Sequence, residues 1–179
     1  HEMGIEFIDV EPRLAKKLVG PLGEILETTS AKSLLYECIR TIVAGMTSQE
    51  KIVRQAVDKL KDMLDDTDPN IKFLALYALT FLLESHPRIV AEHKGNIFGC
   101  IEHEDSNIQY CALKLVRGLV TKTTLMDTTA LLMGAMGKSA QRFRDELVWS
   151  VIHICMNDRY ALVTDFVWYL TVLADLVPL

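Results

Sequence analysis

The sequence predicts an all-α fold, a HEAT/armadillo-like α-solenoid built from antiparallel helix pairs. The first observation is an apolar run at residues 71–83, in which only Lys72 and Thr80 are clearly polar. The run is longer than a usual strand and, with its lysine, too short to span a bilayer. A helix that is apolar on nearly every side needs neighbours to cover it. We therefore expect a buried helix with other helices on both flanks.

The second observation is an internal repeat with a spacing of 37 residues. Five positions of the apolar run carry a large aliphatic, an aromatic, a small and two aliphatic residues. The same order occurs one spacing earlier and one spacing later, and a fourth copy follows 39 residues further on. A helical period of this length is typical of HEAT and armadillo arrays, whose units have about 40 residues. The four copies are Leu34, Tyr36, Cys38, Ile39 and Ile42; Ile71, Phe73, Ala75, Leu76 and Leu79; Ile108, Tyr110, Ala112, Leu113 and Val116; and Leu147, Trp149, Val151, Ile152 and Cys155.

Start signals and apolar spacing place the helices in order. Asp68 before Pro69 predicts the start of the central helix, because aspartate caps free amides and proline fits the first turn; Asp105 repeats this cap. The string Thr47-Ser48-Gln49-Glu50 predicts a capping box. The remaining helices are expected at residues 12–28, 31–45, from the capping box at 47–50 to residue 64, 107–121, 125–136, 142–156 and 160–176. A further one carries Ile89, Val90, Ile97, Phe98 and Ile101, and Gly95 and Gly99 weaken it.

The repeat also predicts the organisation of the chain. Residues 1–11 are expected to be a cloning remnant and linker, and residues 12–179 a single solenoid segment of about four helix pairs. A solenoid needs polar terminal repeats, and neither end shows one. We therefore expect a piece of a longer array whose terminal faces are exposed, namely those bearing Leu14, Leu18, Leu22, Leu173 and Leu176.

Composition and charge limit the function. Half of the residues are hydrophobic and 24% are charged, which is a globular balance, and the net charge of -5 argues against a nucleic-acid surface. The four cysteines form no C-x-x-C pair, and Cys38 and Cys155 occupy core positions of the repeat. No signal peptide or transmembrane run is evident, so we expect a reducing, cytoplasmic location.

Three groups of residues come near to known chemistry. Gly134 to Ser139 end like a phosphate-binding loop, but Leu132 stands where the first glycine should be and no strand precedes it; a helix end and polar turn explain them better. Cys155 and His153 are two apart on a helix and face different sides. The Cys100-x-x-His103 spacing suits zinc, yet helix-end or surface roles are the simpler interpretation. The ligand-type residues considered are His86, His93, Cys100, His103 and Cys111.

The aromatic residues Trp149, Trp168 and Tyr169 lie on apolar helical faces, so we expect them in the core. One face of the helix at residues 107–121 is expected to be exposed to solvent, because it carries Gln109, Lys114 and Arg117. Nothing in the sequence supports catalysis. We therefore predict no enzyme, no catalytic, cofactor-binding or metal-binding residues, no cofactor, and no small-molecule substrate.

Short strings within the repeats are more specific than the repeat itself. Arg13 to Leu22, followed by Ser30 to Ile39 with its Leu35-Tyr36-Glu37, resemble the adaptin large chains of clathrin-type adaptor complexes. The continuous match from Pro12 is most similar to the delta branch of that family, from the third heterotetrameric adaptor complex. Further similar strings are His86-Pro87, Arg144-Asp145-Glu146-Leu147 and Asp165 to Leu170.

The resemblance implies a segment of a curved trunk that holds a small and a medium chain and pairs with a second large chain. Such a complex sorts transmembrane cargo from Golgi or endosomal membranes toward lysosome-related compartments, and associates with those membranes peripherally. It implies no lipid or cargo residue at any position here. The alternative is a karyopherin-like HEAT transport receptor, or another regulatory protein-binding scaffold.

Overall fold

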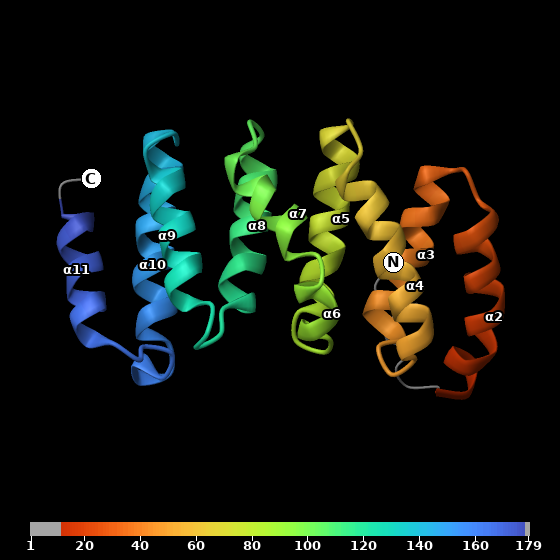
Figure 1. Cartoon of the computed structure of the whole chain (residues 1–179). Coiled ribbons are helices and arrows are strands. Elements are labelled where there is room, and N and C mark those ends of the chain that lie inside the picture. The colour runs from red at the N-terminus through yellow and green to blue at the C-terminus, as the bar shows by residue number, and fades with distance from the viewer. Residues whose placement is uncertain (1–11, 178–179) are drawn as a thin grey trace. The chain divides into compact units, whose positions relative to one another are not determined.

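The structure is a computed structural model that describes residues 12–177. The segment expected to be a remnant and linker, residues 1–11, lies outside this range. Within residues 12–177 the chain forms helices and no strand, which confirms the all-α prediction (Figure 1). The chain divides into two compact units, an N-terminal unit that ends at Phe98 and a C-terminal unit that begins at Gly99.

The N-terminal unit is built from helices that pack in succession (Figure 1). Helix α3 contacts α2, α4 and α5, and α4 also contacts α5 and the short α6. This is the packing of consecutive helix pairs, in which each helix covers the apolar faces of its neighbours. The helices are α2 (Pro12–Thr28), α3 (Lys32–Gly45), α4 (Glu50–Leu64), α5 (Pro69–Leu82), α6 (Pro87–Ala91) and α7 (Lys94–Gly99).

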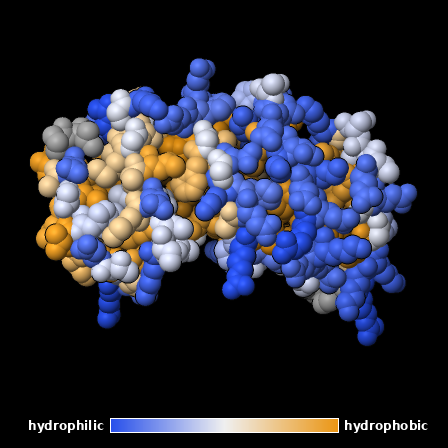
Figure 2. Space-filling model, in the orientation of Figure 1, coloured by the Kyte–Doolittle hydropathy of each residue, from blue (hydrophilic) through white to orange (hydrophobic). Residues whose placement is uncertain are grey.

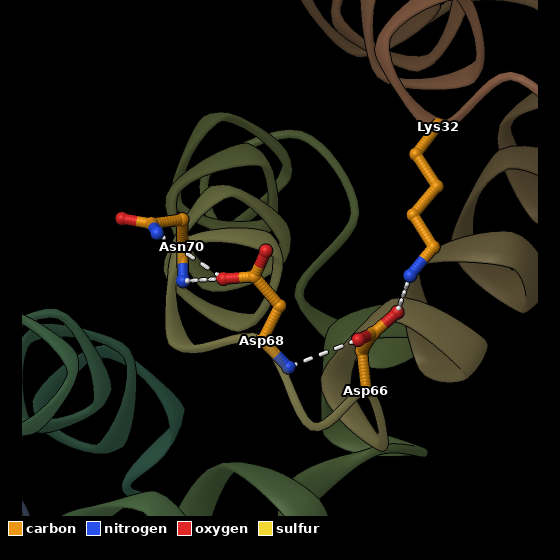
Figure 3. Close-up of polar contacts among 4 residues, drawn as sticks. All are labelled: Lys32, Asp66, Asp68 and Asn70. Carbon is orange, nitrogen blue, oxygen red and sulfur yellow. Dashed lines mark hydrogen bonds and ion pairs between the residues drawn. The ribbon is translucent and has the colours of Figure 1, made fainter.

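The start of α5 follows the predicted cap. Asp68 Oδ1 accepts hydrogen bonds from the backbone N–H and the side-chain amide of Asn70, at 2.8 and 3.1 Å (Figure 3). The backbone N–H of Asp68 in turn donates to Asp66 Oδ1 over 3.0 Å. Pro69 is the first residue of the helix. Its lack of a backbone N–H costs no hydrogen bond there, because the first N–H groups of a helix have no partner within the helix.

Two predicted features of the N-terminal unit are wrong. The capping box does not form: α4 begins at Glu50 after Gln49, without a side-chain cap. The backbone N–H of Gln49 bonds instead to the carbonyl of Met46 in a tight turn, which removes the geometry a box needs. The helix expected across residues 89–101 is instead divided into α6, α7 and a 3-10 turn. The break between α6 and α7 lies at Glu92 and His93, whereas Gly95 is inside α7 and Gly99 is its last helical residue before the 3-10 turn.

The C-terminal unit repeats the helix-pair arrangement. Helix α10 packs against both α8 and α9, and α8 contacts the 3-10 turn η1. Asp105 caps α8 as predicted, because its Oδ1 accepts from the N–H groups of Asn107 at 2.8 Å and Ile108 at 3.3 Å. The elements are η1 (Cys100–Glu102), α8 (Ser106–Leu119), α9 (Leu125–Met136), α10 (Gln141–Tyr160) and α11 (Phe166–Leu176).

The last helix starts later than predicted. The helical dihedrals of α10 stop before Asn157, and the next three residues, Asp158, Arg159 and Tyr160, have left-handed backbone with φ of 45, 55 and 63°. A new helix begins only at Phe166, where Asp165 Oδ1 accepts from the N–H groups of Val167 and Trp168 at 2.8 and 3.1 Å. This cap, the third of its kind, was not recognised in the sequence.

Burial tests the repeat positions one by one, and the first is buried only in the last two copies, at Ile108 and Leu147. The third and fifth positions are buried in all four copies, as at Ala75, Leu79, Ala112 and Val116. The fourth is buried in three copies, and Ile152 is half-buried. The second position changes from buried Tyr36, through half-buried Phe73 and Tyr110, to Trp149 with 68% of its surface exposed. The prediction that Trp149 lies in the core is therefore wrong, because its position is at the margin of the packed face.

Candidate interaction surface

The metal-ligand candidates are dispersed. Within residues 12–177, no group of three or more histidine, cysteine, aspartate or glutamate side chains could hold a metal ion. His86 precedes α6 and its Nδ1 lies 3.0 Å from the Ser85 hydroxyl, while His93 is half-buried between α6 and α7. His103 Nδ1 accepts the backbone N–H of Asp105 at 3.0 Å, and so helps to shape the turn before α8.

The thiols are buried rather than arranged for chemistry. Cys100 and Cys111 lie in the core of the C-terminal unit, and burial raises the pKa of the Cys111 thiol to about 11. Cys155 is fully buried and its thiol pKa is also raised to about 11 by burial, whereas His153 is exposed on the same helix. The two side chains thus occupy different environments, and they make no nucleophile–base pair.

The residues that end like a phosphate-binding loop form the end of α9. Gly137 follows the last helical residue, and Ser139 Oγ donates to the Ala135 carbonyl over 2.8 Å. Lys138 Nζ is 3.0 Å from Glu102 Oε1, in an ion pair. A helix end followed by a polar turn is therefore confirmed.

Exposed apolar side chains are concentrated in the C-terminal unit. Figure 2 shows a broad hydrophobic surface over its last helices, α9 to α11, at the left of the view. Large apolar residues rarely lie exposed in such density unless they meet a partner. The exposed large apolar residues of this unit are Met126, Leu131, Trp149, Met156, Phe166, Val167, Leu170 and Val177. We call this set the C-terminal apolar surface.

The exposed residues of α11 differ from those predicted. Leu176 is buried and Leu173 half-buried, whereas Phe166, Val167 and Leu170 have 56, 74 and 64% of their surface exposed. At the other end, Leu14, Leu18 and Leu22 are half-buried along α2. The expectation that Leu176 is exposed is wrong, because Leu176 lies with Tyr169 and Val172 on the face of α11 that is buried. Of the other aromatics, Tyr169 is buried as expected and Trp168 is half-buried.

The N-terminal unit exposes fewer apolar residues, and α5 carries two of them. Phe73, Tyr77 and Phe81 follow each other at intervals of four along α5, with ring centroids 6.0 and 5.1 Å apart. Tyr77 and Phe81 each have 43% of their surface exposed, so α5 keeps one aromatic face in solvent while its opposite face is buried. Elsewhere the visible face of this unit is mainly hydrophilic (Figure 2).

Within residues 12–177, no helix is both long and apolar enough to cross a membrane. The solvent-exposed face predicted for α8 is confirmed at Lys114 and Arg117, whereas Gln109 is half-buried. The described part of the chain therefore offers both charged and apolar surfaces for contact with other molecules.

Comparisons with known proteins identify the family. A family model described as the adaptin N terminal region matches residues 3–179. The chain is 38% identical over 178 residues to AP-3 complex subunit delta-1 of Bos taurus, a match that covers 95% of this chain and 15% of the relative. It is 35% identical to AP-3 complex subunit delta of Arabidopsis thaliana, covering 93% of this chain and 19% of that protein. The chain thus spans less than a fifth of the length of these relatives.

A structural comparison supports the same fold. A chain in a structure described as a homology model of the full-length AP-3 complex in an intermediate open conformation matches with a TM-score of 0.74. The match covers 93% of this chain and 33% of the other, at 24% identity. The α-solenoid prediction and the resemblance to the delta branch of the adaptins are confirmed. With the family model matching nearly the whole sequence, the chain belongs to the family of adaptin N-terminal regions.

Proposed function

We propose that this chain is a non-catalytic scaffold segment in the large subunit of a vesicle-coat adaptor complex. The observation that carries the proposal is the match to delta subunits of AP-3 complexes over 93–95% of the chain. The helix-pair architecture suits the role, because stacked helical repeats present long lateral surfaces to partner chains.

The proposed partners are the second large, the medium and the small chain of such a complex. Through that complex the chain associates peripherally with Golgi or endosomal membranes from the cytoplasmic side, and supports cargo transport toward lysosome-related compartments. Neither nucleic acid nor a small-molecule substrate takes part. The C-terminal apolar surface supports a role in partner contact, because exposed aromatic and aliphatic side chains such as Trp149 and Phe166 are typical anchors of protein interfaces.

Co-expression tests the proposal. The full-length large chain that contains this segment is expressed with the other three chains and purified through a tag on the medium chain. We expect all four chains to be recovered together. Recovery of the medium chain without the large chain, under conditions in which both are folded, would overturn the proposal.

Two variants test whether the C-terminal apolar surface contributes. Trp149→Ser removes an exposed indole from α10, and Glu146→Ser is the matched control because Glu146 is exposed on the same helix. We expect Trp149→Ser to reduce recovery of at least one partner and Glu146→Ser to leave it unchanged. Equal recovery of the partners with both variants would show that Trp149 does not contribute to the interface. A transport receptor would instead be captured by a Ran-type GTPase, and the family match gives that alternative no support.

A further inference from the structure

A pocket in the C-terminal unit carries an unusual set of side chains. It has a volume of about 570 Å³, within the roughly 300–1,000 Å³ of small-ligand sites, and it lies between the later turns of α8 and α10. Lys114 and Arg117 line it from α8, and His153 and Asn157 from α10. Each pair is three or four residues apart, which places its two side chains on one face of a helix. Two polar rows therefore meet across the pocket.

The cationic side chains of the pocket have no acidic partner among the described residues. None of the residues that line it is acidic. Within residues 12–177, the side chains of Lys114, Arg117 and His153 make no hydrogen bond or ion pair with another residue. The lysine and arginine are exposed, although the chain as a whole has a net charge of -5. Two cations on one pocket wall without an acidic partner make the pocket locally positive, which favours the binding of an anion.

The end of the pocket is formed where α10 leaves helical geometry. Asn157 has ψ of 138°, and the three residues after it, none of them glycine, adopt left-handed backbone. Such conformations are costly for residues with a Cβ, and they persist at binding sites where the surroundings enforce them. Here the Tyr160 ring packs against both Phe166 and Tyr169, with ring centroids 5.8 and 5.7 Å away. This packing fixes the turn next to Asn157.

We propose that this pocket binds a phosphate monoester, carried on a phosphorylated serine or threonine of a peptide. Such a group has a charge of about -2 and three acceptor oxygens, which matches the two permanent cations and the donors of His153 and Asn157. The guanidinium of Arg117 suits phosphate because it can donate two parallel hydrogen bonds. Ile154 and Leu162, which also line the pocket, offer apolar contacts to the rest of the peptide.

The charge of the surrounding unit favours a peptide over a lipid headgroup. From Gly99 to Leu179 the sequence has seven lysine and arginine residues and nine aspartate and glutamate residues, a net charge of -2. Binding to an anionic membrane surface normally uses a cluster of about four to eight basic residues. The pocket has only two cations and lies in an acidic unit. It is therefore suited to a single phosphate group on a peptide side chain that enters the pocket. This inference rests on the pocket alone, and does not depend on the proposed function.

The test is a titration of the 179-residue chain with a blocked Gly-Ala-phosphoserine-Ala-Gly peptide, followed by NMR shifts of backbone amides. We expect shifts to concentrate at residues 114–120 and 153–157, and the unphosphorylated peptide to cause none. Arg117→Gln and Lys114→Gln should each weaken binding by about tenfold, the tenfold step corresponding to the loss of one charged contact. Arg142→Gln is the matched control, because Arg142 is exposed at the opposite end of α10 and does not line the pocket.

Titrations with two other phosphate-bearing ligands distinguish a peptide site from a site for free phosphate or for a lipid headgroup. Inorganic phosphate should bind more weakly than the peptide, and vesicles containing phosphatidylinositol phosphates should not bind through these residues. Equal affinity for phosphate and the peptide would show a small-anion site, and Lys114- and Arg117-dependent vesicle binding would show a headgroup site; either result overturns the peptide proposal. Unchanged binding by the folded Lys114→Gln/Arg117→Gln double variant would also overturn it. Melting curves identify any variant that does not fold.

Discussion

Lys32 Nζ donates to Asp66 Oδ2 over 2.6 Å, and joins the first turn of α3 to the residue two before the cap of α5 (Figure 3). The other oxygen of Asp66 accepts the backbone N–H of Asp68, so one carboxylate links the starts of two successive repeats. Similar pairs bridge one repeat elsewhere: Arg54 with Glu92, 38 residues apart, and Lys138 with Glu102, 36 residues apart. Ion pairs at about the repeat spacing thus join neighbouring repeats within each unit.

The Lys32–Asp66 pair predicts a pH-dependent difference in stability. The ion pair with Lys32, and then the backbone N–H of Asp68, lower the pKa of the Asp66 carboxyl below its ordinary 3.8. A carboxyl whose pKa is lower in the folded chain stabilises that chain above its unfolded pKa, and this contribution disappears as pH falls through the folded pKa. Asp66→Asn should therefore melt slightly below the parent at pH 7, and together with it near pH 2.

Melting curves at several pH values check this prediction. Asp62→Asn is the control, because Asp62 is exposed on α4 and, within residues 12–177, makes no hydrogen bond or ion pair. If the difference in melting temperature between the parent and Asp66→Asn stays constant from pH 7 to pH 2, the charge of Asp66 is not the cause of the difference.

The helix caps predict unequal effects of alanine at two helix starts. Asp68→Ala removes the acceptor of the Asn70 N–H and should cost about 0.5–2 kcal/mol of unfolding free energy. Thr47→Ala should cost much less, because the capping box that Thr47 would begin does not form. Urea denaturation of both variants measures the contrast. A loss at Thr47 as large as at Asp68 would mean that a box forms in solution.

The fourth repeat position predicts the cost of a cavity. Leu113 is buried in α8, so Leu113→Ala should lower the free energy of unfolding by about 2–5 kcal/mol. Leu131→Ala on α9 is the control, because 41% of the Leu131 surface is already exposed and its truncation leaves no closed cavity. Ala112→Trp should be severe, since the indole has no space at a fully buried position. A Leu113→Ala melting curve that overlays the parent would contradict this register.

The buried thiols predict slow alkylation. With a pKa of about 11 for Cys111 and Cys155, about one thiol in a thousand is ionised at pH 8, and only the thiolate reacts. Mass spectrometry after iodoacetamide treatment should find both cysteines unmodified in the native chain and modified in urea. Rapid native labelling of Cys155 would show that the core around α10 opens readily.

Sequence patterns predicted the helices well where local signals were strong. The predicted ranges 12–28 and 125–136 match α2 and α9, and Asp68 and Asp105 cap the helices they were expected to cap. These features depend on neighbouring residues, and so they can be recognised without knowledge of the fold. The capping box at Thr47 failed because a turn at Gln49 satisfied the backbone differently. No titratable cluster in the sequence indicated the pocket at Arg117 and His153, because its two sides are separated by about one repeat.

The sequence by itself determined the fold class and the family, because a 37-residue helical period and short adaptin-like strings are properties of residue order. It also determined the inward third and fifth repeat positions, since helical periodicity places them on one face. Only the tertiary structure decided that Trp149 is exposed, that Leu176 is buried, and that Lys114 and His153 share a pocket. Exposure at the margin of a helix face depends on how closely the next helix approaches, and that distance is set by packing between segments far apart in the chain.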